Sequence, residues 1–249
     1  MMAVATSTVA DSKGGLRAAG RLLCIVAALL VALALHGTWR ALGRFSPWPR
    51  RFLRRVAIIL GADIRVVGTP LRRDAMIAAN HLSWMDILLL AGTSGTRFVA
   101  KAEVASQPLI GWLASLNRTL FVERGDRLCV GDQVATIRTA LTEGQPLAVF
   151  PEGTTGDDLS ILPFKPALFA ALVPPLPGIR VQPVRIDYGA AAADLAWLGT
   201  DPGDAHVKRV LRRRGRFTVT LHYLEPFDPA DFPDRKAIAA EARRRIVMS

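Results

Sequence analysis

Cysteine and histidine, the residues that build disulfide frameworks and zinc centres, are both scarce in this sequence. The 249 residues include only two cysteines, Cys24 and Cys129, which stand far apart in dissimilar surroundings. A disulfide-stapled protein is therefore excluded, and the composition is typical of a reducing, cytoplasmic compartment. The four histidines are scattered at spacings that do not match a zinc site. We expect no bound metal.

Acidic residues are also few relative to basic ones. The chain has 21 aspartates and glutamates against 32 lysines and arginines, which gives a net charge of +11 and an isoelectric point near 10.9. Such a charge favours anionic partners, whether anionic lipids, nucleic acids or acidic carriers. The length suits one α/β domain that carries an N-terminal extension.

The N-terminal extension contains an unbroken apolar stretch. It covers residues 22–35, 14 in all, and a helix of that length spans about 21 Å. Adding residues 36–39 brings it close to the roughly 30 Å hydrocarbon core of a bilayer. A secretory signal peptide fits less well, because no clear small-residue cleavage site follows. We expect a helix that enters the membrane or dips into one leaflet.

The segment after this stretch combines aromatic residues with arginines and has no acidic residue until Asp63. The interleaved residues are Trp39, Arg40, Arg44, Phe45, Trp48, Arg50, Arg51, Phe52, Arg54 and Arg55. Rings and guanidinium groups suit the headgroup layer, and a basic cluster belongs on the cytoplasmic side. We expect anionic membrane lipids as partners, at the inner (cytoplasmic) membrane, with the active site facing the cytoplasm. A solvated basic linker and nucleic-acid binding are alternatives, but the preceding apolar helix argues against nucleic acid.

Beyond residue 60, short strands alternate with helices. Apolar or alternating runs predict strands over residues 62–67, 75–79, 97–100, 119–122, 147–150, 179–188 and 216–224. Helical spacing predicts helices over residues 83–90, 108–116, 126–141 (with Asp126 as N-cap) and 165–172, and a basic helix closes the chain. This alternation indicates an α/β fold with a mostly parallel sheet flanked by helices.

The predicted organisation has three parts. Residues 1–15 form a disordered tail, residues 16–60 form membrane-anchoring helices, and residues 61–249 form one catalytic domain.

Two motifs about 70 residues apart follow predicted strands. The first reads Asn-His-Leu-Ser-Trp-Met-Asp over residues 80–86, and the second reads Phe-Pro-Glu-Gly-Thr over residues 150–154. A histidine oriented by a carboxylate is a general base, and a glycine turn brings N–H groups close to an anion or oxyanion. Together they supply the minimum groups for acyl transfer.

His81 and Asp86 meet only in one local arrangement. Five residues of ideal helix turn the chain by about 500°, which would point the two side chains roughly 140° apart. We therefore place His81 in the loop before a helix and Asp86 in the first turns of that helix. Asp86 then holds the imidazole Nδ1 proton, and Nε2 faces a substrate hydroxyl.

These residues could also have purely structural roles. His81 would be an ordinary turn residue, Asp86 a helix cap and Glu152 a solvated turn residue. Ser83 is a competing nucleophile, but it lacks the Gly-x-Ser-x-Gly surroundings of a serine hydrolase. We interpret Ser83 as an early helical residue.

The two motifs resemble those of the glycerolipid acyltransferase family, whose members acylate 1-acylglycerol-3-phosphate or lyso-ornithine lipid. Two further segments resemble family blocks: residues 121–124, an aromatic followed by Arg124, and residues 181–184, a strand that carries a proline. The resemblance covers roughly residues 70–190. It implies that Glu152, Gly153 and Thr154 help to bind the acyl acceptor.

Arg124 and Lys101 are the expected anion ligands. A guanidinium binds phosphate with two donors, and a lysine acts as a point charge. Many phosphate-directed family members carry an arginine at the position of Thr155. The threonine found here is more similar to the lyso-ornithine-lipid branch. We expect lysophosphatidic acid (1-acyl-sn-glycerol-3-phosphate) as the acceptor, giving phosphatidic acid, with lyso-ornithine lipid as the alternative.

The expected reaction is transfer of a fatty acyl group from acyl-CoA or acyl carrier protein to a lysolipid hydroxyl, with His81 as base and no bound cofactor. One alternative is an acyl thioesterase or lipid hydrolase in which His81 activates water. Another is a basic membrane- or nucleic-acid-binding protein without activity.

Overall fold

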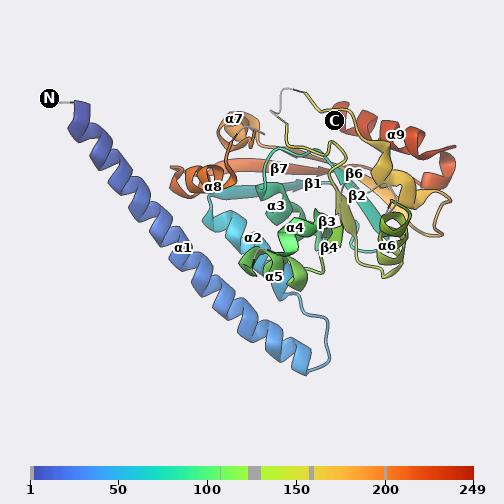
Figure 1. Cartoon of the computed structure of the whole chain (residues 1–249), viewed down its shortest axis with the longest axis horizontal. Coiled ribbons are helices and arrows are strands. Elements are labelled where there is room, and N and C mark those ends of the chain that lie inside the picture. The colour runs from blue at the N-terminus through green and yellow to red at the C-terminus, as the bar shows by residue number, and fades with distance from the viewer. Residues whose placement is uncertain (1–2, 107, 123–129, 157–159, 199–200) are drawn as a thin grey trace.

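The computed structural model describes residues 3–106, 108–122, 130–156, 160–198 and 201–249. Within these residues a seven-stranded sheet has helices on both faces, and a long N-terminal helix extends beside it (Figure 1). The strands are β1 (Ala62–Val67), β2 (Ala75–Ala79), β3 (Arg97–Lys101), β4 (Leu120–Val122), β5 (Leu147–Val149), β6 (Arg180–Asp187) and β7 (Phe217–Tyr223). The helices are α1 (Ala3–Ala41), α2 (Trp48–Ile59), α3 (Met85–Ser94), α4 (Ala102–Ala105), α5 (Pro108–Leu116), α6 (Val130–Thr142), α7 (Ala192–Leu195), α8 (Gly203–Arg212) and α9 (Arg235–Val247).

The sheet confirms the expected mostly parallel α/β fold. Its strand order is β1-β7-β6-β2-β5-β3-β4, and of the neighbouring pairs only β6 and β7 run antiparallel. Strand β2 lies between β5 and β6, with Ala78 opposite Val149 and Ala79 opposite Val184. The carboxyl ends of these three strands therefore meet at one edge of the sheet.

Strand β2 separates two hydrophobic cores. Met76 and Ala78 belong to the core beneath α6 and α9, whereas Ile77 and Ala79 belong to the core beneath α2, α3 and α8. Successive side chains of a strand point to opposite faces, so a strand covered on both sides must be apolar throughout. All five residues of β2 are buried, which explains the uninterrupted apolar run in the sequence.

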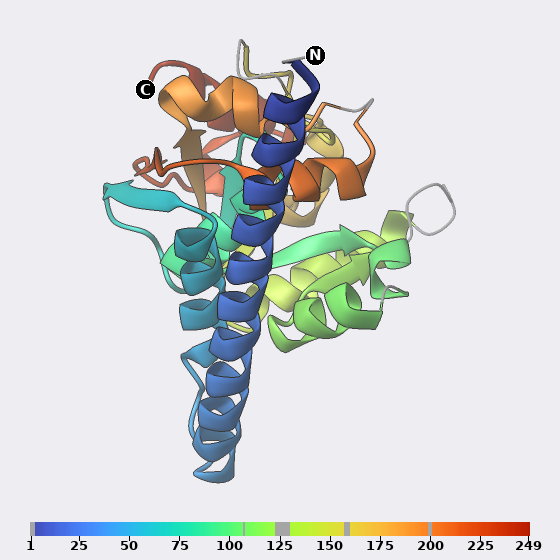
Figure 2. The ribbon, with the colours of Figure 1, turned by 90° about the vertical axis from the view of Figure 1, so that its left-hand side faces the viewer.

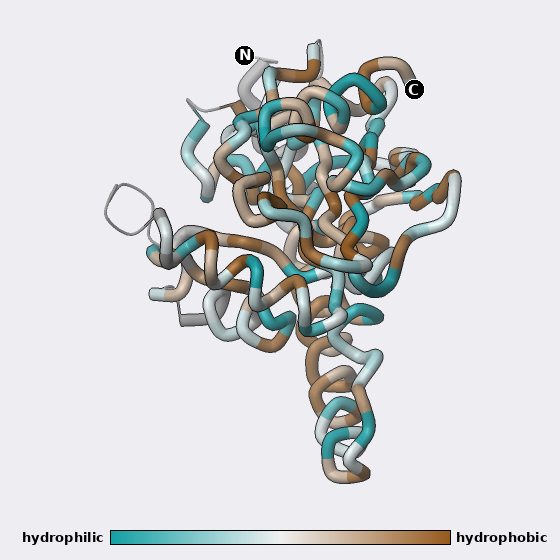
Figure 3. Tube along the Cα trace, turned by 90° about the vertical axis from the view of Figure 1, so that its right-hand side faces the viewer, coloured by the Kyte–Doolittle hydropathy of each residue, from teal (hydrophilic) through white to brown (hydrophobic). Residues whose placement is uncertain are grey.

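Helix α1 is docked along the side of the domain. Arg17 and Arg21 donate hydrogen bonds of 2.8–2.9 Å to carbonyl groups of the last turn of α8, and Ile25, Ala28 and Leu29 pack against the domain core. Beyond these contacts α1 projects below the domain together with the connection to α2 (Figure 2). Apolar stretches alternate with polar ones along this projection (Figure 3).

The outer face of α1 is apolar. Leu23 is 72% exposed and Leu30 is 62% exposed. Residues 13–41 form a helix long and apolar enough to cross a membrane by length and composition, and an 18-residue window within it has a mean hydropathy of 2.5. This confirms that the N-terminal region contains an apolar helix of membrane length.

The N-terminal boundaries differ from the expected ones. The segment over residues 1–15, expected to be a disordered tail, is helical from Ala3 onward. It continues a helix that already exists, so it avoids the cost of nucleation, and its alanines favour helix. Helix α2 was expected at the membrane interface, but it buries Phe52, Val56 and Ala57 in the domain core. The packed domain therefore begins before residue 61.

Several helices also differ from the predicted ones in their bounds or type. Helix α3 begins at Met85, not Ser83, because the preceding residues form a loop whose N–H groups bond to the Asp86 side chain. The expected helix over residues 165–172 is a 3₁₀ helix over Pro166–Leu172. The proposed N-cap Asp126 lies outside the described residues.

Candidate active site

The two sequence motifs meet at the carboxyl edge of the sheet. His81 follows β2 and Glu152 follows β5, and these strands are parallel neighbours. The carboxyl ends of strands in an open α/β sheet are where such folds bind ligands. Residues 71 positions apart in the sequence thus come into direct contact, because the His81 N–H donates to Glu152 Oε1 at 2.8 Å.

Asp86 orients the imidazole of His81. Asp86 is the second residue of α3, and its Oδ2 lies 2.8 Å from His81 Nδ1. The same oxygen accepts the N–H groups of Leu82 and Ser83 at 2.7 and 2.9 Å. Asp86 is completely buried, whereas the His81 side chain is 17% exposed. The observed arrangement, histidine in the loop and aspartate in the first helical turn, is the one predicted.

The second oxygen of Asp86 is also occupied. Tyr188, the residue after β6, donates its hydroxyl to Asp86 Oδ1 at 2.6 Å. Tyr188 is 1% exposed. The carboxylate is therefore held at both oxygens, from its own loop on one side and from a neighbouring strand on the other.

The imidazole ring is further held by aromatic packing. It stacks on Phe150, with ring centroids 3.9 Å apart and planes inclined by 14°. Phe150 in turn stacks on Phe98. With Nδ1 bound to Asp86, Nε2 of His81 has no partner among the residues that the structure describes, so it is available to a substrate.

Glu152, in the second motif, accepts hydrogen bonds from two backbone N–H groups, one of which belongs to His81 in the first motif. Its Oε2 accepts the N–H of Leu162 at 3.0 Å, while Oε1 accepts that of His81. Burial raises the pKa of Glu152, and the two N–H donors oppose this shift. The sequence assigned Glu152 to the acceptor, yet both of its oxygens bond to the backbone. The structure shows a positioning contact with the backbone of His81, and the role of Glu152 toward the acceptor stays a prediction.

The turn after Glu152 is tightly built. Gly153 has φ +74°, a left-handed conformation that favours glycine, and a Cβ at this position would lie 2.6 Å from Lys165 Nζ. Thr154 is exposed. The Thr155 hydroxyl donates to the carbonyl of Trp197. Of the motif residues, Gly153 and Thr154 are the exposed ones and are open to a substrate.

The expected anion ligands are only partly visible. Lys101 ends β3, opposite Val122, and its side chain is not described. Arg124 lies outside the described residues. Lys165, which the sequence left without a role, is the basic side chain beside the Gly153 turn. Ser83 is completely buried, so it is not placed to act as a nucleophile.

Comparison with known proteins agrees with this geometry. A family model described as Acyltransferase matches residues 63–187, which include both motifs and β6. The chain belongs to the acyltransferase family. A lyso-ornithine lipid O-acyltransferase of Rhodobacter capsulatus is 36% identical over 93% of this chain and 87% of its own length. A 1-acyl-sn-glycerol-3-phosphate acyltransferase of Neisseria gonorrhoeae is 34% identical over 53% of this chain and 51% of its own length.

The fold of this acyltransferase is also similar to a solved structure. The crystal structure of the 1-acyl-sn-glycerophosphate acyltransferase of Thermotoga maritima superimposes with a TM-score of 0.70 and 22% sequence identity. The similarity covers 95% of this chain and 94% of the other. It therefore extends well beyond the motifs.

Two residues of the acyltransferase site, Asn80 and Tyr188, were assigned no role from the sequence. The Asn80 side chain makes two hydrogen bonds with the backbone of Ile186, of 3.0 and 2.7 Å, which join the end of β2 to β6. This contact brings Tyr188 beside Asp86. The asparagine was visible in the first motif, but no local pattern connects residues 80 and 188.

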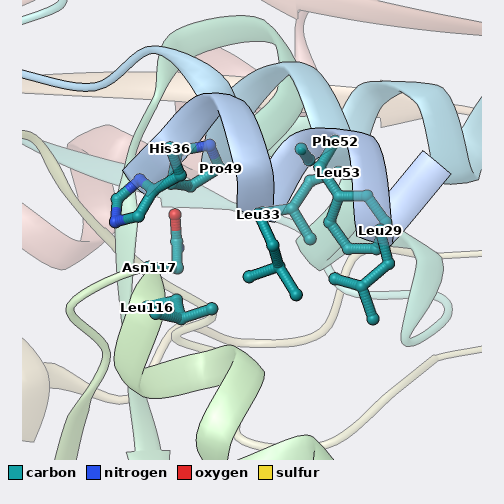
Figure 4. Close-up of a pocket in the computed structure, with 9 residues that line it drawn as sticks. Leu29, Leu33, His36, Pro49, Phe52, Leu53, Leu116 and Asn117 are labelled. Atoms are coloured by element: carbon teal, nitrogen blue, oxygen red, sulfur yellow. The ribbon is translucent and has the colours of Figure 1, made fainter. Parts of the chain in front are cut away.

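A small apolar pocket lies away from this site. Helices α1 and α2 and the end of α5 line it, as the side chains in Figure 4 show. Its Asn117 donates to the carbonyl of Thr96, just before β3 begins. The pocket is therefore near the amino edge of the sheet, opposite to His81, and does not belong to the catalytic motifs.

Proposed function

We propose that this acyltransferase moves a fatty acyl group from a thioester donor, acyl-CoA or acyl carrier protein, to the hydroxyl of a lysolipid. The observation that carries the proposal is the His81–Asp86 pair, with Nδ1 held by a buried carboxylate and Nε2 open. A general base of this kind needs no metal.

The reaction proceeds by direct attack of the acceptor. His81 Nε2 takes the hydroxyl proton as the oxygen attacks the thioester carbonyl, while Asp86 stabilises the imidazolium that forms. The new C–O bond replaces the C–S bond, and the departing thiolate takes the proton back from His81. The nucleophile is the substrate itself, which agrees with the burial of Ser83.

We propose lyso-ornithine lipid as the first acceptor and lysophosphatidic acid as the second, the reverse of the order expected from sequence. Four lyso-ornithine lipid O-acyltransferases are 34–36% identical over 82–93% of this chain, whereas the Neisseria gonorrhoeae relative matches over 53%. The Thr155 hydroxyl bonds to a protein carbonyl, and no guanidinium stands at that position to bind a phosphate.

Helix α1 and the lipid-acylating relatives point to membrane association. We propose that the enzyme attaches to the inner membrane from the cytoplasmic side, with anionic lipids against its arginines. While α1 stays docked on α8 and α2, its exposed apolar face can enter one leaflet, but the docked half cannot cross the bilayer.

One assay tests this proposal. The purified chain is incubated with vesicles containing both lysolipids at equal concentration and with acyl-CoA or acyl carrier protein in separate arms, and the lipids are identified by mass spectrometry. Acylated ornithine lipid as the main product supports the proposal. Free fatty acid at the same rate with and without lysolipid would instead establish a hydrolase, and exclusive formation of phosphatidic acid would reverse the order of acceptors.

A further inference from the structure

The sequence has only two tyrosines, and the hydroxyl of one of them, Tyr188, donates a hydrogen bond to the Asp86 carboxylate of the active site. Tyr188 follows β6, is 1% exposed and donates to Asp86 Oδ1 at 2.6 Å. The other three donors to Asp86 all bind Oδ2 and come from residues 81–83. Among the hydrogen bonds of the described residues, Tyr188 is thus the one hydroxyl donor to this carboxylate and the one donor from outside residues 81–83.

The hydroxyl limits how the carboxylate can move. Three donors converge on Oδ2, so without a donor at Oδ1 a fully buried carboxylate would carry an unpaired oxygen. The position of Tyr188 is itself set by the two Asn80–Ile186 hydrogen bonds, which tie β6 to the strand that carries His81. A donor at Oδ1 also draws charge from Asp86, which weakens its pull on the imidazole proton.

We propose that Tyr188 is a positioning residue for acyl transfer. Its hydroxyl holds Asp86 in the orientation that presents Oδ2 to His81, and it moderates how strongly Asp86 stabilises the imidazolium. The inference rests on the proposed function, because it assigns Tyr188 a part in the same proton transfer.

Other ionisable groups surround the pair on both sides. His81 and Glu152 face Asp86 from the two motifs. On the other side, Tyr188 lines a surface cleft together with three charged residues, Asp187, Arg213 and Arg216. The same groups are present in wild type and variant, so a difference between the two pH profiles reports the hydroxyl itself.

The chain offers a matched control in its second tyrosine. Tyr223 is 4% exposed, and its hydroxyl lies 2.6 Å from Thr93 Oγ1 on the same helix as Asp86. Tyr188→Phe and Tyr223→Phe each remove a buried hydroxyl that contacts α3, but only the Tyr188 hydroxyl touches the His81–Asp86 pair. Steady-state kinetics, thermal unfolding and the pH profile of kcat/KM are measured for both, with His81→Ala alongside.

We expect Tyr188→Phe to lower kcat by about tenfold to a hundredfold with little change in the KM for the lysolipid, as for loss of a hydrogen bond to a charged group. The acidic limb of the pH profile should move to higher pH, because the freed carboxylate stabilises the imidazolium more strongly. Tyr223→Phe should keep kcat within about twofold and an unchanged profile, since its hydroxyl contact is neutral and remote.

Two outcomes would overturn the inference. One is a Tyr188→Phe enzyme with wild-type kcat and pH profile, and the other is equal kinetic losses in both tyrosine variants, which would show a merely structural contact. If His81→Ala keeps its activity, the proposed function itself fails. An inactive His81→Ala with a fully active Tyr188→Phe removes only the role of Tyr188.

Discussion

The catalytic edge of the sheet and the N-terminal helices are built in opposite ways. At the catalytic edge, Asp86 and Glu152 are buried and each of their carboxylate oxygens accepts at least one hydrogen bond. Along α1, large apolar side chains such as Leu23 and Leu30 lie open. On α2, burial and then the neighbouring arginines lower the pKa of Arg50, and within the described residues no acidic group pairs with it.

The proposed roles of the two regions account for this difference. Proton transfer needs groups that are already oriented when the substrate arrives, so the protein itself satisfies the donors and acceptors around His81. A surface that meets a bilayer keeps apolar side chains and cations unsatisfied until lipid tails and headgroups reach them. Changes at the edge should therefore alter turnover, and changes on α1 should alter membrane binding.

The largest expected effect separates turnover from folding. His81→Ala should lower acyl transfer by about a hundredfold to ten-thousandfold, the usual contribution of a positioned general base. The bond between Glu152 and the backbone N–H of residue 81 does not need the imidazole, so the fold should survive. Lipid product formation and circular dichroism measure the two effects.

His222→Ala on β7 is the matched control for this variant, since it removes an imidazole elsewhere in the sheet. It should retain near-normal turnover. Near-normal turnover in a folded His81→Ala protein would contradict the assignment of the base.

Charges on the outer face of α1 should separate binding from turnover. The double variant Leu23→Glu, Leu30→Glu places two carboxylates on the face of α1 that we propose meets lipid, and each charge at the centre of a membrane costs roughly 2.5–3.5 kcal/mol or more. We expect at least a tenfold loss of sedimentation with anionic vesicles. Thermal stability should hold, because both side chains are exposed.

Val66→Glu, at an exposed position of β1, serves as the comparison for the α1 variant. It should sediment like the wild type. Undiminished binding of the α1 variant would place the anchor elsewhere, for example in the basic runs at residues 212–214 and 243–245.

Glu152→Gln tests whether the second motif supports the first. An amide can satisfy only one of the two N–H donors that Glu152 now accepts, so stability should fall by about 1–3 kcal/mol. Turnover should fall as well, because His81 loses its backbone support. Denaturant unfolding measures the first effect, with the exposed Glu103→Gln as a control that should change neither quantity.

The smallest expected effect concerns the acid stability of α8. His206 is fully buried, accepts a hydrogen bond from Trp84 Nε1 at Nδ1, and lies 3.1 Å from the Leu195 carbonyl through Nε2. Burial lowers the pKa of His206. Below its usual value of about 6.5 the unfolded chain binds a proton that the folded chain resists, so stability is lost as pH falls toward the lowered value.

Unfolding free energies measured between pH 5 and 8 test this expectation (about the range in which an unperturbed histidine titrates). His206→Gln should reduce the dependence of the unfolding free energy on pH below pH 6.5, whereas His222→Ala should leave that dependence unchanged. An identical slope in His206→Gln would show that another group governs the acid response.

Much of this protein was accessible from local sequence patterns. The strands over residues 62–67 and 75–79 match the observed bounds, because an alternating or continuous apolar run reports directly on burial. The contact between His81 and Asp86 was also predictable, since five residues and one loop-to-helix junction contain all of its geometry. The apolar helix at the N-terminus needed only a count of consecutive apolar side chains.

Only the tertiary structure decided the contacts that cross between strands. Glu152 proved to hold the backbone of His81 because β5 lies beside β2, and Tyr188 reached Asp86 because β6 lies on the other side of β2. Helix α2 has the arginines of a membrane-surface segment, yet its other face completes the domain core. Local periodicity shows which residues are buried, but it carries no information on strand order, and strand order determines which distant side chains meet.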